Sequence, residues 1–121
     1  MKTLSILLML STALLTGTVA AQDTLEEAKA HYAAAAYEEA LSTLTRVDAT
    51  YASNPSSINR VELEQYRAFC FIALGKLAEA ERAVASLVAA DPRYVPSATV
   101  ASPKVLQLVS EMRRKELRSP S

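Results

Sequence analysis

The sequence predicts an all-α fold of two helix–turn–helix hairpins followed by a C-terminal helix. Its composition favours helices, because alanine is abundant, half of the residues are hydrophobic and only two glycines are present. Two segments forty residues apart, 35–41 and 75–81, share one pattern: a small residue at a helix end, a large apolar residue two positions later, and an alanine three positions after that. Each segment ends one amphipathic pattern and begins another, so each predicts a hairpin. Stacked hairpins usually bind partners rather than catalyse reactions.

Residues 1–21 have the pattern of a secretory signal peptide. Lys2 gives a positive start, residues 6–15 form an apolar segment, and small residues precede a cleavage site after Ala21. The apolar segment is shorter than the ~20 residues that a membrane-spanning helix needs. Retention of the segment as an anchor stays open as the alternative. A cleaved signal of this form predicts a bacterial protein that is periplasmic or exported.

The remaining residues are enough for one small domain. We expect two hairpins and a proline-containing strap within 22–102, and a C-terminal helix with its tail within 103–121. The 13 basic and 13 acidic side chains balance, which argues against a dedicated nucleic-acid-binding protein. Cys70 is the one cysteine, so an intramolecular disulfide cannot form. Its apolar neighbours predict a buried thiol, with an intermolecular disulfide as the alternative.

The first hairpin is predicted to begin near Asp23. An acidic residue followed by Glu26 three positions later has the form of a capping box. The turn at 35–36 contains neither glycine nor proline, so its position is inferred from the repeat alone. The second helix is expected over about 37–50, because its apolar residues recur at helical spacing: Ala40, Leu41, Leu44 and Val47.

The second hairpin begins with the longest predicted helix, about 56–74, with Asn54 or Ser57 as its cap. Its apolar face is wide, so neighbours should cover it on more than one side. Gly75 suits the left-handed residue that ends such a helix. A fourth helix over about 77–90 stops before Pro92.

Residues 91–102 are expected to form an extended, ordered strap. The fifth helix then begins at 102–103, with a serine cap and a proline in the first helical position. Four basic residues near its end suit the helix dipole, with contact to anionic lipid or an acidic partner as the alternative: Arg113, Arg114, Lys115 and Arg118. We expect this helix to pack on the second hairpin and cover its open end.

Residues 24–92 resemble the tetratricopeptide repeat family. The second unit carries the better match, in its turn glycine, apolar positions, small positions and closing proline: Ala68, Phe71, Gly75, Leu77, Ala80, Val84, Leu87 and Pro92. The first unit matches at Ala28, Ala35, Tyr37, Ala40, Leu44 and Val47, but has Ala52 where the family has proline. The spacing of forty also exceeds the usual repeat of about 34 residues, and the 48–57 loop accommodates the excess.

The resemblance implies a non-catalytic protein–protein interaction module whose inner face holds a protein or peptide. Six residues are expected to face that groove: Leu25, Lys29, Tyr32, Glu62, Gln65 and Phe69. The basic and asparagine clamp that some members use for a terminal carboxylate is absent, since the corresponding positions hold Leu25, Lys29, Glu62 and Tyr66. In the alternative interpretation the fifth helix fills the groove, and the six residues belong to the core.

An enzyme is not predicted. His31 has Glu27 four positions before it, but zinc needs three or four ligands and the sequence indicates no others. Acidic pairs lie at helix starts, where they favour the helix dipole. We therefore expect no metal, cofactor or nucleic-acid partner, and membrane contact only if residues 1–21 are retained. The second hypothesis is a structural or assembly subunit that self-associates through exposed helix faces.

Overall fold

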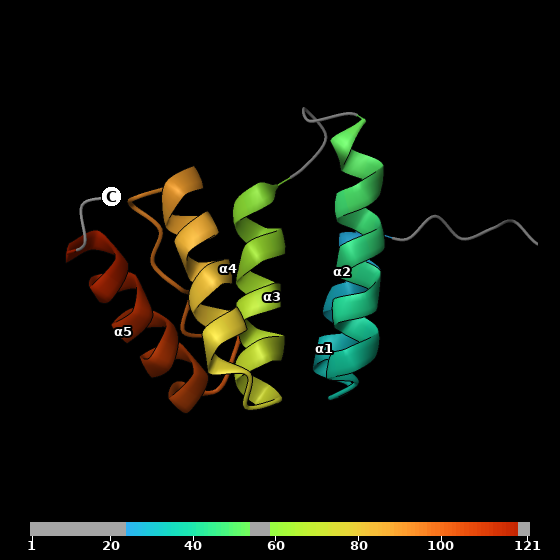
Figure 1. The fold of residues 1–121 in the computed structure, drawn as a ribbon. Helices are drawn as coiled ribbons and strands as arrows, with labels where there is room; N and C mark the ends of the chain where they lie inside the picture. The colour runs from blue at the N-terminus through green and yellow to red at the C-terminus, as the bar shows by residue number, and fades with distance from the viewer. Residues whose placement is uncertain (1–23, 54–58, 119–121) are drawn as a thin grey trace, which may run out of the picture.

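The computed structural model describes residues 24–53 and 59–118, which form five α-helices and no strand. The helices are α1 (Leu25–Ala33), α2 (Tyr37–Ala52), α3 (Arg60–Ala73), α4 (Leu77–Ala90) and α5 (Pro103–Arg118). Figure 1 shows α1 and α2 at one end of a row, then α3 and α4, then α5. The predicted all-α class is confirmed for these residues. The predicted signal peptide with its Ala21 cleavage site, and the tail 119–121, lie outside the described residues.

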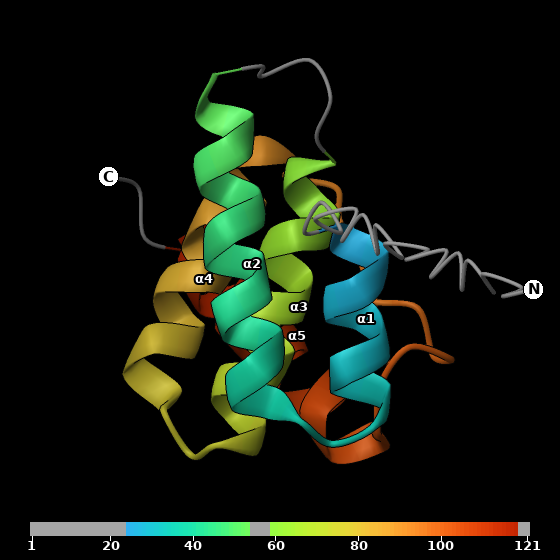
Figure 2. The same cartoon turned by 90° about the vertical axis from the view of Figure 1, so that its right-hand side faces the viewer.

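The hairpins stack consecutively. Helix α3 contacts both helices of the first hairpin, and α5 contacts both helices of the second, so α5 repeats the position of α3 one unit further along. Figure 2 views the stack from its first hairpin, with α1 and α2 in front of α3 and with α5 at the far end. The expected packing of the C-terminal helix on the second hairpin is confirmed.

The two hairpin turns have the same geometry. The same pair of backbone hydrogen bonds closes each turn, at 2.8 and 3.0 Å: Ala36 to His31 and Ala35 to Tyr32 in the first, Lys76 to Phe71 and Gly75 to Ile72 in the second. Both turns need a left-handed residue, which is Ala35 (φ 59°) in one and Gly75 (φ 74°) in the other. These are the bonds and the conformation of a Schellman cap. The first turn therefore lies where the repeat predicted it.

Helix α1 begins one residue later than the predicted capping box implies. Its cap is Thr24, whose Oγ1 accepts a hydrogen bond from the amide of Glu27 at 3.1 Å. A serine, threonine or asparagine cap satisfies an amide that no helical carbonyl reaches. Asp23, the predicted cap, lies outside the described residues.

Helix α3 begins at Arg60, later than the predicted position 56. Asn59 caps it, because the side-chain Oδ1 accepts a hydrogen bond from the amide of Glu62 at 3.1 Å. The predicted caps Asn54 and Ser57 lie in the part of the chain that is not described. Helix α2 extends two residues beyond its predicted end, whereas α4 and the start of α5 are as predicted.

Small residues at equivalent positions allow the helices of each hairpin to approach closely. Ala28 and Ala40 in the first hairpin and Ala68 and Ala80 in the second are fully buried. Larger apolar side chains fill the space between the hairpins and against α5, with Phe69, Leu44, Leu63 and Leu87 the largest that are fully buried. The repeat that the sequence displays is therefore a repeat of packing positions.

Exchanging the turn residues tests this equivalence. Ala35→Gly should raise the free energy of unfolding by about 0.5–1 kcal/mol, because relief of left-handed strain outweighs the entropy of glycine in the unfolded chain. Gly75→Ala should lower the free energy of unfolding by about the same amount. An added Cβ would meet nothing within 4 Å, so the loss of stability comes from the left-handed backbone conformation alone. Urea unfolding followed by circular dichroism measures both. Ala49→Gly, on the exposed side of α2, is the control and should be destabilising; destabilisation by Ala35→Gly would contradict the assigned turn.

Cys70 should react only when the protein unfolds. The thiol is fully buried, and burial raises its pKa to about 12. Labelling by a thiol reagent at pH 8 should therefore be slow in native buffer and should accelerate in urea in step with unfolding. Native labelling as fast as that of a free cysteine peptide would contradict the burial of this side chain.

Candidate functional site

The inner face is the surface that α1 and α3 form together. Lys29 of α1 and Glu62 of α3 pair across it, with Nζ and Oε1 2.6 Å apart and side chains 29% and 28% exposed. Lys29 also lies 3.2 Å from Glu26 and 5.8 Å from the ring centroid of Tyr66. Hydrogen bonds to Glu62 and Glu26 raise the pKa of Lys29, so the ammonium stays charged. Two of the six predicted residues are thus a direct ion pair between the hairpins.

An aromatic cluster of Tyr32, Tyr37, Tyr66 and Phe69 lies beside this pair. The ring of Tyr32 is 5.6 Å from each of the other three rings, and those of Tyr66 and Phe69 are 5.5 Å apart. Such spacing is favourable for tilted and edge-to-face aromatic packing. Tyr32 is half-buried, and burial raises its pKa to about 12, so the hydroxyl stays protonated. The cluster joins α1, α2 and α3.

Two of the predicted groove residues are covered rather than open. Phe69 is the fully buried member of the aromatic cluster, so it supports the exposed rings and is not open to a partner. Gln65 is 8% exposed, and its Oε1 accepts a hydrogen bond from the hydroxyl of Tyr94 in the strap. Leu25 is half-buried and packs against the core. Lys29, Tyr32 and Glu62 are the predicted residues that combine partial exposure with polar groups.

In the alternative interpretation of the sequence, the fifth helix fills the groove. In the structure, the strap covers the part of the groove at Gln65 instead. Helix α5 does pack on α3, but Gln65 is covered by Tyr94. Figure 2 shows the orange strap emerging on the side of α1 rather than on that of α2. The sequence carried no periodic signal for this contact, because the strap is not a helix; a lone tyrosine between two prolines was the available hint.

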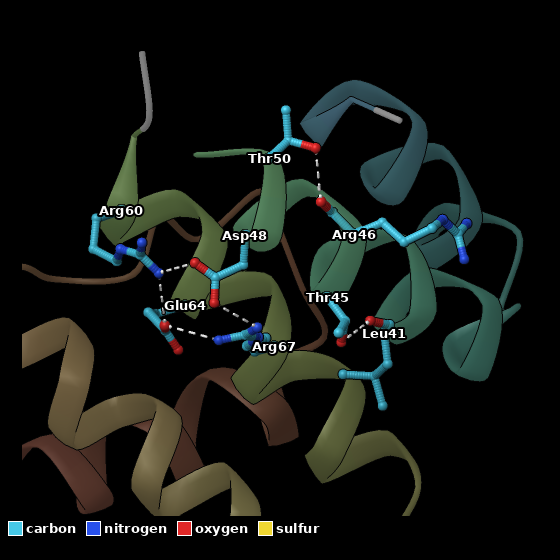
Figure 3. Close-up of polar contacts among 8 residues, drawn as sticks. All are labelled: Leu41, Thr45, Arg46, Asp48, Thr50, Arg60, Glu64 and Arg67. Atoms are coloured by element: carbon cyan, nitrogen blue, oxygen red, sulfur yellow. Dashed lines mark hydrogen bonds and ion pairs between the residues drawn. The ribbon is translucent and has the colours of Figure 1, made fainter. Parts of the chain in front are cut away.

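A second polar cluster, which sequence reasoning missed, joins α2 to α3 away from the inner face (Figure 3). Asp48 contacts Arg60 at 2.8 Å and Arg67 at 3.1 Å, and Glu64 contacts Arg67 at 3.1 Å and Arg60 at 3.5 Å. Burial raises the pKa of Glu64, which is 5% exposed. Burial would also raise that of Asp48, but the hydrogen bonds and charges of Arg60 and Arg67 outweigh it and lower the pKa.

The sequence reveals that Arg60, Glu64 and Arg67 share one face of a helix, because they are three and four positions apart. It does not reveal their pairing with Asp48, because that pairing depends on how the hairpins stack. A groove of about 280 Å³ beside this cluster is lined by α2, α3 and α4, including Glu64, Arg67 and Phe71. Because Glu64 and Arg67 neutralise each other there, the cluster is best explained as a junction between hairpins.

The other candidate residues do not assemble a reactive site. The Nε2 of His31 lies 3.9 Å from Glu27, and in residues 24–53 and 59–118 there is no group of three or more His, Cys, Asp or Glu side chains that could hold a metal ion. Within the basic cluster of α5, Lys115 pairs with Glu81 at 3.4 Å and Arg113 donates to the carbonyl of Pro92 at 3.4 Å. Of the helices described, none has the length and apolar character needed to cross a bilayer.

Comparisons with family models, with curated proteins and with solved structures gave no match. The resemblance to the tetratricopeptide repeat family therefore stays a prediction from the residues. What the described residues establish is a consecutive stack of helical hairpins with a partly exposed charged and aromatic inner face.

A double-mutant cycle on the inner face should detect the inter-hairpin ion pair. Lys29→Met and Glu62→Gln should show a coupling free energy of about 0.5–1 kcal/mol in urea unfolding, which is the upper part of the range for partly exposed pairs. The coupling should shrink in 1 M salt. The matched pair Lys115 and Glu81 is more exposed, at 71% and 47%, and should couple less. Equal coupling for the two pairs would contradict the special position of Lys29.

Proposed function

We propose that this protein is a non-catalytic interaction module that binds a segment of another protein on its inner face. The observation that carries the proposal is the clustering of Lys29, Glu62 and half-buried Tyr32 where the two hairpins meet. Aromatic side chains supply contact area at low entropic cost, and partly exposed charges fix orientation. In this proposal Tyr32 packs against the partner, while Lys29 and Glu62 exchange part of their mutual pairing for polar groups of the bound segment.

The repeat architecture supports a binding role. Stacked hairpins expose an extended surface to which consecutive units contribute equivalent positions. Here α1 and α3 contribute those positions, and the buried alanines and hairpin turns hold them in register. Rigid presentation lowers the entropic cost of binding, which favours recognition by few residues.

We further propose that binding takes place in the bacterial periplasm or outside the cell. The support is the sequence pattern of residues 1–21, with its basic start, apolar segment and predicted cleavage after Ala21. A self-associating assembly subunit is the alternative function, and the experiment below separates the two.

Affinity capture with matched variants tests the function. The immobilised protein should recover a partner from envelope extract, and Lys29→Ala with Tyr32→Ala should reduce recovery at least about tenfold, which corresponds to a loss of about 1.4 kcal/mol. A control variant, Thr45→Ala with Ser86→Ala, alters the groove between α2, α3 and α4 and should leave recovery unchanged. Equal recovery of the partner by both variants would show that the inner face is not the binding surface. Recovery of this chain alone would favour self-association.

A further inference from the structure

We propose that the strap is a displaceable occupant of the inner face, and that the partner is a protein segment whose tyrosine takes the place of Tyr94 on Gln65. This inference rests on the proposed function and names the chemistry of the bound segment. It also makes the strap an autoinhibitory element, because the part of α3 that contains Gln65 is closed while Tyr94 occupies it.

The strap contacts the inner face as a bound peptide would. Tyr94 is 9% exposed, whereas the next residue, Val95, is 69% exposed and Arg93 is also exposed. One side chain therefore inserts while its neighbours point outward. The hydroxyl donates to Oε1 of Gln65, which gives the inserted ring a specific polar contact as well as apolar burial. The backbone before Tyr94 is not extended as predicted: residues 91–94 form a turn, in which the amide of Tyr94 donates to the carbonyl of Asp91, and Pro96 restricts the backbone after the inserted residue.

Few hydrogen bonds hold this segment to the helices, and its apolar anchor is Tyr94, which packs in the buried core. The amide of Arg93 donates to the side chain of Asp91 at 3.0 Å, and that of Tyr94 to the carbonyl of Asp91 at 3.1 Å, so both bonds are local. For residues 92–100, within the described chain, the hydrogen bonds to helices are that of Tyr94 with Gln65 and that of Arg113 with the carbonyl of Pro92. Val100 packs on the core near α5 and anchors the far end. Displacement of residues 92–99 can therefore leave all five helices in place.

The covalent connection of the strap to the helices sets how strongly it competes with a free partner for the site at Gln65. A segment joined by a short linker has an effective concentration in the millimolar range. A free partner binds only the fraction of molecules in which the strap has left, so its apparent affinity falls by that fraction. Loss of the Tyr94 side chain should remove this competition and raise the affinity for an external segment of the same chemistry.

Peptide binding in trans tests the inference. The probe is a fluorescent synthetic peptide of residues 90–98, titrated into the wild-type protein and into Tyr94→Ala. We expect the peptide to bind Tyr94→Ala at least about tenfold more tightly than the wild type. A peptide with alanine in place of its tyrosine should not bind, and one with phenylalanine should bind about fivefold more weakly, because the carbonyl of Gln65 then lacks its donor. In a Tyr94→Ala protein that also carries Gln65→Met, the tyrosine and phenylalanine peptides should bind equally.

Three results would overturn the inference. They are undetectable binding to Tyr94→Ala at millimolar peptide, equal affinity of the peptide for wild type and variant, and loss of helical circular dichroism in Tyr94→Ala. The last result would show that the strap is an integral part of the core. Failure here combined with successful capture through Lys29 and Tyr32 would remove the strap from the mechanism and leave the proposed function intact. Failure of both the peptide titration and the affinity capture would show that the inner face is not a binding surface.

Discussion

Burial of α3 among all four other helices is the constraint on which the rest of the structure depends. This helix packs on α1 and α2, forms its own hairpin with α4 and supports α5. It therefore buries eight of its fourteen residues, including the polar pair Glu64 and Gln65. A buried polar group is tolerated only with a partner. The two sides of α3 provide those partners differently: arginines reach Glu64 on one side, and the strap reaches Gln65 on the other.

This division separates the charge cluster between α2 and α3 from the inner face, on which we propose that a partner binds. Arg60 and Arg67 of α3 pair with the partly exposed Asp48 of α2 and with the buried Glu64. On the inner side, the Lys29–Glu62 pair and Tyr32 remain partly open to solvent. Both sets of charges are paired and partly exposed, except for the buried Glu64; the inner-face pair differs in lying beside aromatic rings, where we propose that a partner makes contact.

Much of the fold could be predicted from the sequence because the repeat is local and periodic. The turn at Ala35 was predicted without glycine or proline, since Gly75 marks the equivalent position. Helix starts were less predictable, because neighbouring residues such as Asp23 and Thr24 have similar capping chemistry. The inner face was predicted as a set of positions, but its closure at Gln65 was not. The contact with Tyr94 spans 29 residues and comes from a segment without periodicity, so only tertiary packing specifies it.

Native-state hydrogen exchange followed residue by residue tests the central claim, that a rigid α3 carries a strap that can leave it. Amides in the middle of α3 should exchange only through global unfolding, with an opening free energy equal to that measured in urea. The amides of Tyr94 and Val100 should exchange at least about a hundredfold faster, through local opening that leaves the helices protected. Exchange of α3 ahead of α1 and α5, or strap amides as slow as those of α3, would contradict this account.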